Sequence, residues 1–158
     1  MKKNIFLTIS LILALSFFGV FENKSYAQAS TKTVQKPVVA MPLNVVANPN
    51  KYLGKTLKMQ ATFDKFSTLG LDYNKALRKS TEYIGILIQR DDVVDHNIPL
   101  SEMKLFLKKD LAEKHIDLDT GDKIEMVAKV FSTALNDPWL DVQSITVIKK
   151  AKKEENDK

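Results

Sequence analysis

A cluster of carboxylates follows one apolar segment of this 158-residue chain and is the first place to look for metal chemistry. Asp91 and Asp92 come directly after Arg90, and Asp95 follows three residues later. Carboxylate oxygens bind divalent cations and an arginine pairs with phosphate, so this grouping suits a metal-dependent phosphodiesterase or nuclease. A charged turn after a strand explains the same residues without any chemistry, and we expect that simpler explanation to hold.

Other reactive residue types give little support for an enzyme. The chain has no Cys, and its two histidines, His96 and His115, lie in no nucleophile motif. The segment 117–122, "DLDTGD", resembles a calcium loop, but its Gly comes one place early and Ala128 stands where a bidentate Glu is required. We therefore expect no catalytic activity, no bound metal and no cofactor.

The N-terminus carries the signals of an export leader. Two lysines precede an apolar run at 5–21, and "SYAQA" then offers small residues at the spacing that signal peptidase recognises. Cleavage after Ala27 or Ala29 is expected rather than a retained anchor, because the run is slightly short for a span of about 20 residues. A cleaved leader at 1–27 predicts an exported, periplasmic or extracellular protein without a stable membrane span.

The formal net charge of +5 is unevenly spread. The range 43–148 carries 14 basic and 15 acidic residues, while the excess positive charge lies in the leader, in a Pro-punctuated segment at 28–42 and in the tail at 149–158. Proteins that bind nucleic acid through its phosphates concentrate positive charge on the folded surface. We therefore expect a flexible linker at 28–42, a disordered charged tail, and a partner other than nucleic acid.

Hydrophobic periodicity predicts the strands. Apolar and polar residues alternate over 56–64 and again over 123–132, as in half-buried strands. The apolar segment 83–90 is a further strand, in which Gly85 indicates a bend or the close approach of a neighbouring strand. The last strand covers 139–148.

Two further segments complete the predicted elements. The stretch 43–48 is a helical turn that stops before a proline, and "IPL" at 98–100 is a short edge strand. The segment 101–115 is predicted to be a helix, because its apolar residues have the spacing of one helix face and Ser101 suits the N-cap. Those apolar residues are Met103, Phe106, Leu107 and Leu111.

The order of these elements predicts the fold. The loop between the last two strands is too short for a parallel crossover, so those strands form a hairpin. A small sheet that is apolar on both faces is better closed than open, because closure removes exposed edges. We predict a mainly β fold: a small five-stranded barrel over 43–148, like the oligonucleotide/oligosaccharide-binding (OB) fold, with one helix between strands three and four.

Three stretches of the sequence resemble exported bacterial OB-fold proteins. "NPNKYLGKTLKMQATF" (48–63) is similar to an opening in which Asn-Pro-x-x-Tyr-x-Gly-Lys leads into the first barrel strand. "DTGDKIEMVAKVF" (119–131) is similar to the Gly-Asp turn and fourth strand, and "DPWLDVQSI" (137–145) to the fifth strand. The resemblance implies that ligands bind across the second and third strands, between the loops 67–82 and 132–139.

The residues that the resemblance places at this candidate site are aromatic or basic: Tyr73, Lys75, Arg78, Lys79, Tyr83, Arg90 and Trp139. Aromatic rings beside cations can stack on sugars or bases. In the alternative, Trp139 and Tyr83 fill the barrel ends and the cations are ordinary surface. This alternative is favoured, because a small barrel needs large side chains to fill it.

These features together predict an exported, non-enzymatic OB-fold binding module of the bacterial cell envelope. Its expected ligand is an oligosaccharide, a wall fragment or another protein. Two alternatives stay open: an extracytoplasmic metal-dependent phosphodiesterase or nuclease that uses the Asp91 cluster, and a nucleic-acid-binding OB protein.

Overall fold

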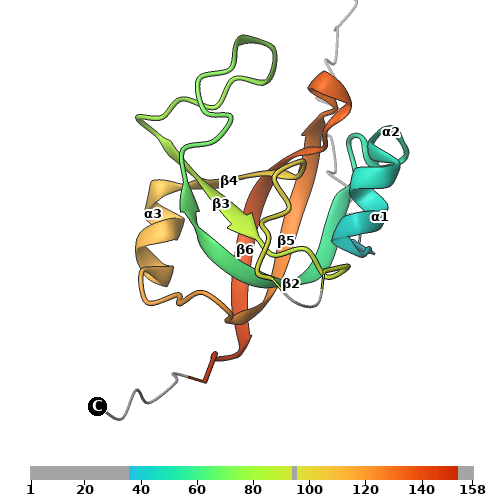
Figure 1. Ribbon diagram of the computed structural model, residues 1–158. Helices are drawn as coiled ribbons and strands as arrows, with labels where there is room; N and C mark the ends of the chain where they lie inside the picture. Colours follow the sequence, from blue (N-terminus) through green and yellow to red (C-terminus); the bar gives the residue numbers. More distant parts are fainter. Residues whose placement is uncertain (1–35, 94–95, 153–158) are drawn as a thin grey trace, which may run out of the picture. The chain divides into compact units, whose positions relative to one another are not determined.

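Strands are the main regular structure of the computed structural model, which describes residues 36–93 and 96–152 (Figure 1). The strands are β1 (Val38–Val39), β2 (Thr56–Ser67), β3 (Tyr83–Ile88), β4 (Lys104–Lys108), β5 (Lys123–Ser132) and β6 (Trp139–Lys149). The helices are α1 (Pro42–Ala47), α2 (Pro49–Tyr52) and α3 (Lys109–Ala112). Short 3₁₀ turns are η1 (Asn74–Ala76), η2 (Glu113–His115) and η3 (Ala134–Asn136).

Strands β2 to β6 close into a barrel. Strand β2 pairs antiparallel with β3, and β3 with β4. Strand β4 then pairs parallel with β6, β6 antiparallel with β5, and β5 antiparallel with β2, which completes the circle. This pairing, with α3 between β4 and β5, is the arrangement of an OB-fold. The predicted fold class is therefore confirmed.

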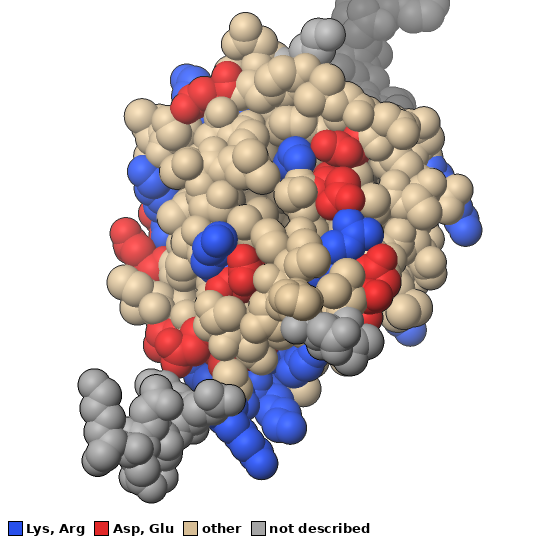
Figure 2. All heavy atoms as spheres, in the orientation of Figure 1, with Lys and Arg blue, Asp and Glu red and all other residues tan. Residues whose placement is uncertain are grey.

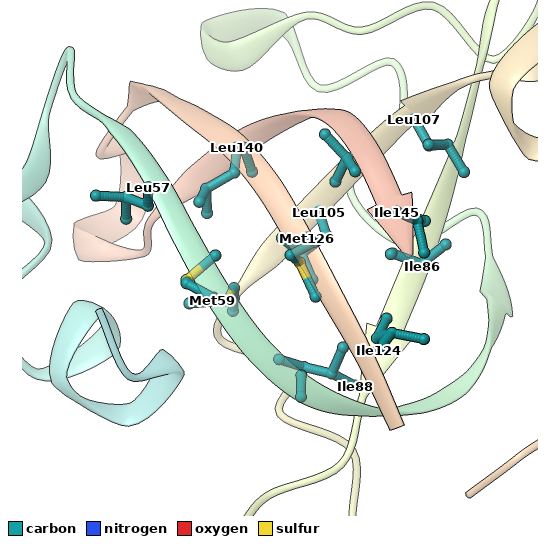
Figure 3. Close-up of a cluster of buried hydrophobic side chains, with 14 of the residues drawn as sticks. Leu57, Met59, Ile86, Ile88, Leu105, Leu107, Ile124, Met126, Leu140 and Ile145 are labelled. Atoms are coloured by element: carbon teal, nitrogen blue, oxygen red, sulfur yellow. The ribbon is translucent and has the colours of Figure 1, made fainter. Parts of the chain in front are cut away.

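The core inside the barrel follows from the alternation read in the sequence. On β2, Leu57, Met59, Ala61 and Phe63 are buried, and so are Ile124, Met126, Ala128 and Val130 on β5. These side chains meet inward-facing residues of β3, β4 and β6 (Figure 3). Each fully buried aliphatic side chain contributes about 1.5–3 kcal/mol relative to an exposed one, so apolar burial alone can hold this Cys-free barrel together.

Gly85 marks a close approach of two strands, as its place in the sequence indicated. It pairs with Ser67 of β2, and a Cβ at position 85 would lie 3.0 Å from the Ser67 carbonyl oxygen. A side chain here would push β2 and β3 apart, so this position requires glycine.

The helix predicted over 101–115 is wrong in its first half. Residues Lys104–Lys108 form β4, and helical structure is confined to α3 and η2. Leu105 and Leu107 point into the main core, whereas Phe106 packs into a second cluster on the outside of the barrel. Strand β4 is thus apolar on both faces, and an apolar run of this kind also fits a helical period.

The short strand predicted at 98–100 is also wrong as a barrel strand. Only Pro99 pairs there, in an isolated bridge to Gln89. The third barrel strand is β4, which lies between β3 and β6.

Both ends of the predicted domain extend further than 43–148. At the N-terminal side, β1 pairs parallel with β2, and the Ala40 N–H donates to the Lys58 carbonyl oxygen at 3.1 Å. At the C-terminal side, the Ala151 N–H donates to Asp122 Oδ1 at 2.8 Å. The end of the linker and the start of the tail are therefore ordered parts of the fold.

Some predictions lie outside the described residues, namely the leader at 1–27, most of the linker, the end of the tail and Asp95. Within 36–93 and 96–152, no helix has the length and apolar character needed to cross a membrane.

Candidate functional site

An OB-fold is expected to bind its ligand on the outer face of its second and third strands, which are β3 and β4 here, and this face continues onto β6 because β6 pairs with β4. In this chain the face lies beside the connection 68–82 and the β5–β6 loop (133–138) (Figure 1). Because side chains alternate along strands, Phe106 of β4 and Trp139 and Asp141 of β6 point outward here.

An aromatic cluster fills the part of this face nearest the β5–β6 loop. Trp139 is 1% exposed, and its ring stacks on Tyr73 and on Phe106 with centroids 5.2 and 5.7 Å apart. The Trp139 Nε1–H donates to the Ala134 carbonyl oxygen at 2.7 Å. A Cβ at Gly70 would lie 3.2 Å from the indole, so loop 68–82 rests directly on the ring. The faces of the Tyr73, Trp139 and Phe106 rings therefore stack against one another rather than facing solvent.

A bidentate ion pair fastens loop 68–82 to the barrel. Arg78 Nε and Nη2 donate to Oδ1 and Oδ2 of Asp141, each at 2.6 Å. The Arg78 guanidinium carbon also lies 3.7 Å from the centroid of the Phe131 ring. The hydrogen bond to Asp141 raises the pKa of Arg78 above its ordinary value. The guanidinium group of Arg78 is thus used to attach loop 68–82 to the barrel.

An open groove lies on the same face, next to α3. It encloses about 370 Å³, and its polar lining comes from Tyr83, Lys108, Asp110, Lys114, Asp141 and Gln143. We call it the α3 groove. No ion pair found within the described residues involves Lys108 or Lys114. An aromatic ring beside an amide, carboxylates and ammonium groups can hold a ligand rich in hydroxyl or amide groups.

The predicted site residues separate into four groups. Tyr73 and Trp139 lie in the aromatic cluster, and Arg78 forms the ion pair with Asp141 that fastens loop 68–82. Tyr83 lines the α3 groove. Lys79 is exposed on the connection, and Lys75 lies in η1.

Arg90 lies apart from the other predicted site residues. It follows Tyr83 by seven residues, which is about 23 Å of extended chain. Arg90 Nε donates to Asp92 Oδ1 at 3.0 Å, and Arg90 Nη1 donates to Glu102 Oε1 at 2.6 Å. The hydrogen bond from Arg90 also holds the pKa of Asp92 below its usual value.

The carboxylate cluster that follows Arg90 is therefore divided. Asp92 pairs with Arg90, whereas Asp91 lines a different groove together with residues of β2, β5 and β6. Within 36–93 and 96–152, no three His, Asp or Glu side chains are grouped closely enough to hold a metal ion.

Phe106 and Asp141 are central to this face, and the sequence reasoning missed both. Phe106 was assigned to a helix face, which hid its outward direction on β4. Asp141 and Gln143 occupy outward positions of a predicted strand, and that alternation was the available signal. The pairing of Asp141 with Arg78, 63 residues away in the chain, has no local signal.

Comparisons with known proteins give only distant similarity. No family model matches the chain, and no curated protein matches it. A crystal structure described as an aspartyl-tRNA synthetase from Leishmania major Friedlin is 13% identical with a TM-score of 0.46, over 80% of this chain and 23% of that one. Asparaginyl-tRNA synthetase from Pyrococcus horikoshii, complexed with asparaginyl-adenylate, is 12% identical with a TM-score of 0.42, over 66% of this chain and 21% of that one. The chain thus spans less than a quarter of either synthetase.

Proposed function

We propose that this protein is an exported, non-enzymatic binding module of the bacterial cell envelope, and that it binds a short oligosaccharide or wall fragment in the α3 groove. The observation that carries the proposal is the division of the OB face. One part is closed by stacked rings, while the part beside α3 is open and lined by polar groups around Tyr83.

The closed part bears on the choice of ligand. OB-folds that bind single-stranded nucleic acid stack successive bases on exposed aromatic rings. Here Trp139 is buried under Tyr73 and Gly70, so this platform is covered by the chain itself. The α3 groove offers one aromatic ring with mixed charges, which suits a compact sugar better than a polyanion.

Binding in the groove can be tested by titrating peptidoglycan fragments and neutral oligosaccharides into protein recovered from a host that expresses the full chain. We expect Gln143→Ala to weaken binding about fivefold to tenfold, because one or two hydrogen bonds are lost. Gln60→Ala removes the same side chain from β2 and is the matched control. Equal losses in the two variants would place the ligand elsewhere.

Nucleic acid is the contrasting ligand. A single-stranded oligodeoxynucleotide is expected to bind weakly or not at all. Salt-sensitive binding that persists after removal of 149–158 would contradict the proposal and support the nucleic-acid alternative. Cleavage of the oligonucleotide with Mg²⁺ or Ca²⁺ that disappears in Asp91→Ala would support the nuclease alternative instead.

Export is tested separately from binding. Fractionation of an expressing bacterium is expected to place the protein outside the cytoplasm, with a new N-terminus after Ala27 or Ala29. A cytoplasmic protein that keeps residues 1–27 would contradict the envelope assignment, whatever the α3 groove binds.

A further inference from the structure

A group of lysines lies at the opposite end of the β5–β6 hairpin from the aromatic cluster. Lys123 begins β5 and Lys149 ends β6, Lys150 follows directly, and Lys152 comes two residues later. We call these four residues the lysine end. They line two adjoining grooves of about 260 and 320 Å³, which share Lys123 and Lys149. Figure 2 shows basic side chains gathered at the lower end of the molecule, where β6 ends in Figure 1.

The strand register places like charges directly opposite each other. Lys123 of β5 is the partner of Lys149 of β6, so their side chains leave the same face of the sheet. Directly opposed like charges destabilise a strand pair. Elsewhere on the same hairpin, Lys129 is opposite Asp141. An anion held between Lys123 and Lys149 would remove this repulsion.

A buried carboxylate fixes the backbone that carries these lysines. Asp122 is fully buried and accepts hydrogen bonds from the backbone N–H groups of Asp119 and Ala151 and from Lys150 Nζ, at 2.8–3.0 Å. Gly121 sits beside this contact with φ of 95°, and a Cβ there would lie 3.2 Å from the Ala151 Cβ. The segment after β6 is thereby tied to the start of β5, and the groove is preformed.

Part of the positive charge is already balanced. Lys150 pairs with Asp117 and Asp122, and Asp91 lines the larger groove, whereas the hydrogen bond from Lys123 to the neutral Thr62 hydroxyl leaves the Lys123 charge unbalanced. Within the described residues no ion pair involves Lys149 or Lys152. The smaller groove therefore has four lysines in its lining and no acidic residue.

We infer that the smaller groove at the lysine end is a second binding site, which takes phosphate groups. Lysine ammonium groups bind phosphate as point charges and need no fixed fork geometry. Lys123, Lys149 and Lys152 present such groups around an open groove whose lining contains no aromatic ring. The site therefore recognises the phosphate itself and is separate from the α3 groove.

Titration with inorganic pyrophosphate and short-chain polyphosphate tests this site, with binding followed by calorimetry and by amide chemical shifts. We expect shifts at Gly121 and Ala151, and tighter binding of polyphosphate than of pyrophosphate. Lys149→Gln and Lys123→Gln each lower the affinity about threefold to tenfold, because each removes one charge-assisted contact. Lys51→Gln, an equal charge change on α2, leaves the affinity within about twofold of wild type.

Three outcomes would overturn the inference. Equal weakening by Lys51→Gln and Lys149→Gln would mean that only the overall charge matters. Equal binding of polyglutamate and polyphosphate would remove the preference for phosphate. Binding to phosphatidylglycerol vesicles without any binding of pyrophosphate or polyphosphate would indicate attraction to a charged membrane surface rather than a groove for phosphate.

Discussion

Both ends of the β5–β6 hairpin have positively charged side chains close to strand termini. At one end the charge is paired with a carboxylate, and at the other a lysine lies opposite a lysine. At the loop end, Arg78 of loop 68–82 pairs with Asp141 on the outer face of the barrel, and stacked rings lie beside the pair. At the lysine end, Lys123 and Lys149 face each other across the same two strands, and Lys149 lies eight residues, about 26 Å of extended strand, beyond Asp141.

This difference teaches how to separate structural cations from binding cations. A cation whose hydrogen bonds are satisfied by a carboxylate, and whose face lies on an aromatic ring, stabilises the fold and has little left for a ligand. A cation placed opposite another cation weakens the fold and gains from a bound anion. Residue type alone suggests a binding site at the loop end, whereas ion pairing and strand register suggest one at the lysine end.

The largest expected effect on the free energy of unfolding comes from disrupting the aromatic cluster at the loop end of the hairpin. Trp139→Ala removes a buried ring together with its contacts to Tyr73 and Phe106, and should lower the free energy of unfolding by about 3–5 kcal/mol. Urea denaturation measures this loss, with Lys149→Gln as the variant that should not destabilise. A loss below about 1 kcal/mol would mean that loop 68–82 is not sealed onto the barrel.

Asp122 should give the next largest effect, and one that depends on pH. Burial by itself raises its pKa, but hydrogen bonds from Ala151, Asp119 and Lys150 outweigh burial, so the pKa is lowered. Its stabilising contribution is thus present above the ordinary carboxyl pKa of about 3.9 and is lost as the pH falls through the lower folded-state pKa. Asp122→Asn should cost about 2 kcal/mol near pH 7 and progressively less below pH 4. A difference that stays constant down to pH 2 would contradict this account.

The Arg78–Asp141 ion pair is expected to contribute less to the free energy of unfolding, because both side chains are partly exposed, at 23% and 29%. A double-mutant cycle with Arg78→Ala and Asp141→Asn should give a coupling free energy of about 1 kcal/mol. The coupling should decrease with added salt. Additive effects of the two substitutions would show that the loop is held by its aromatic contacts alone.

The smallest effect has the opposite sign. Lys149→Gln removes the like-charge partner of Lys123 and should raise the free energy of unfolding by about 0.2–1 kcal/mol at low salt. The gain should vanish near 1 M salt, where the screening length is about 3 Å. Polyphosphate should stabilise wild type more than this variant in the same denaturation experiment. A destabilising Lys149→Gln at low salt would refute the repulsion between the two lysines.

The sequence predicted most clearly the strands whose two faces differ. On β5, and on β2 as far as Gln60, buried residues alternate with more exposed ones, so the period of two is visible in the residues themselves. Strand β4 has neighbours on both sides and apolar contacts on both faces, which erases that period. The helix expected there was therefore a reasonable but incorrect interpretation.

The candidate sites were less predictable, because they depend on register. The β5–β6 pairing shifts at three places, between Lys123 and Ile124, between Val127 and Ala128, and between Val130 and Ser132. Each shift changes which side chains are opposite each other, and a turn sequence does not encode these shifts. The facing lysines were for this reason beyond local patterns, and the Arg78–Asp141 pair joins residues that are 63 positions apart.

The pairing of β4 with β6 has a consequence for how the chain is made. Both β4 and β5 need β6 as a neighbour, so until the final eleven-residue strand is free, each presents an unsatisfied edge. A chain whose residues from about 139 onward are still inside a ribosome or a translocation pore cannot close its barrel. Maturation should accordingly be a late, abrupt event set by long-range contacts, and nascent chains that stall before it should be prone to aggregate.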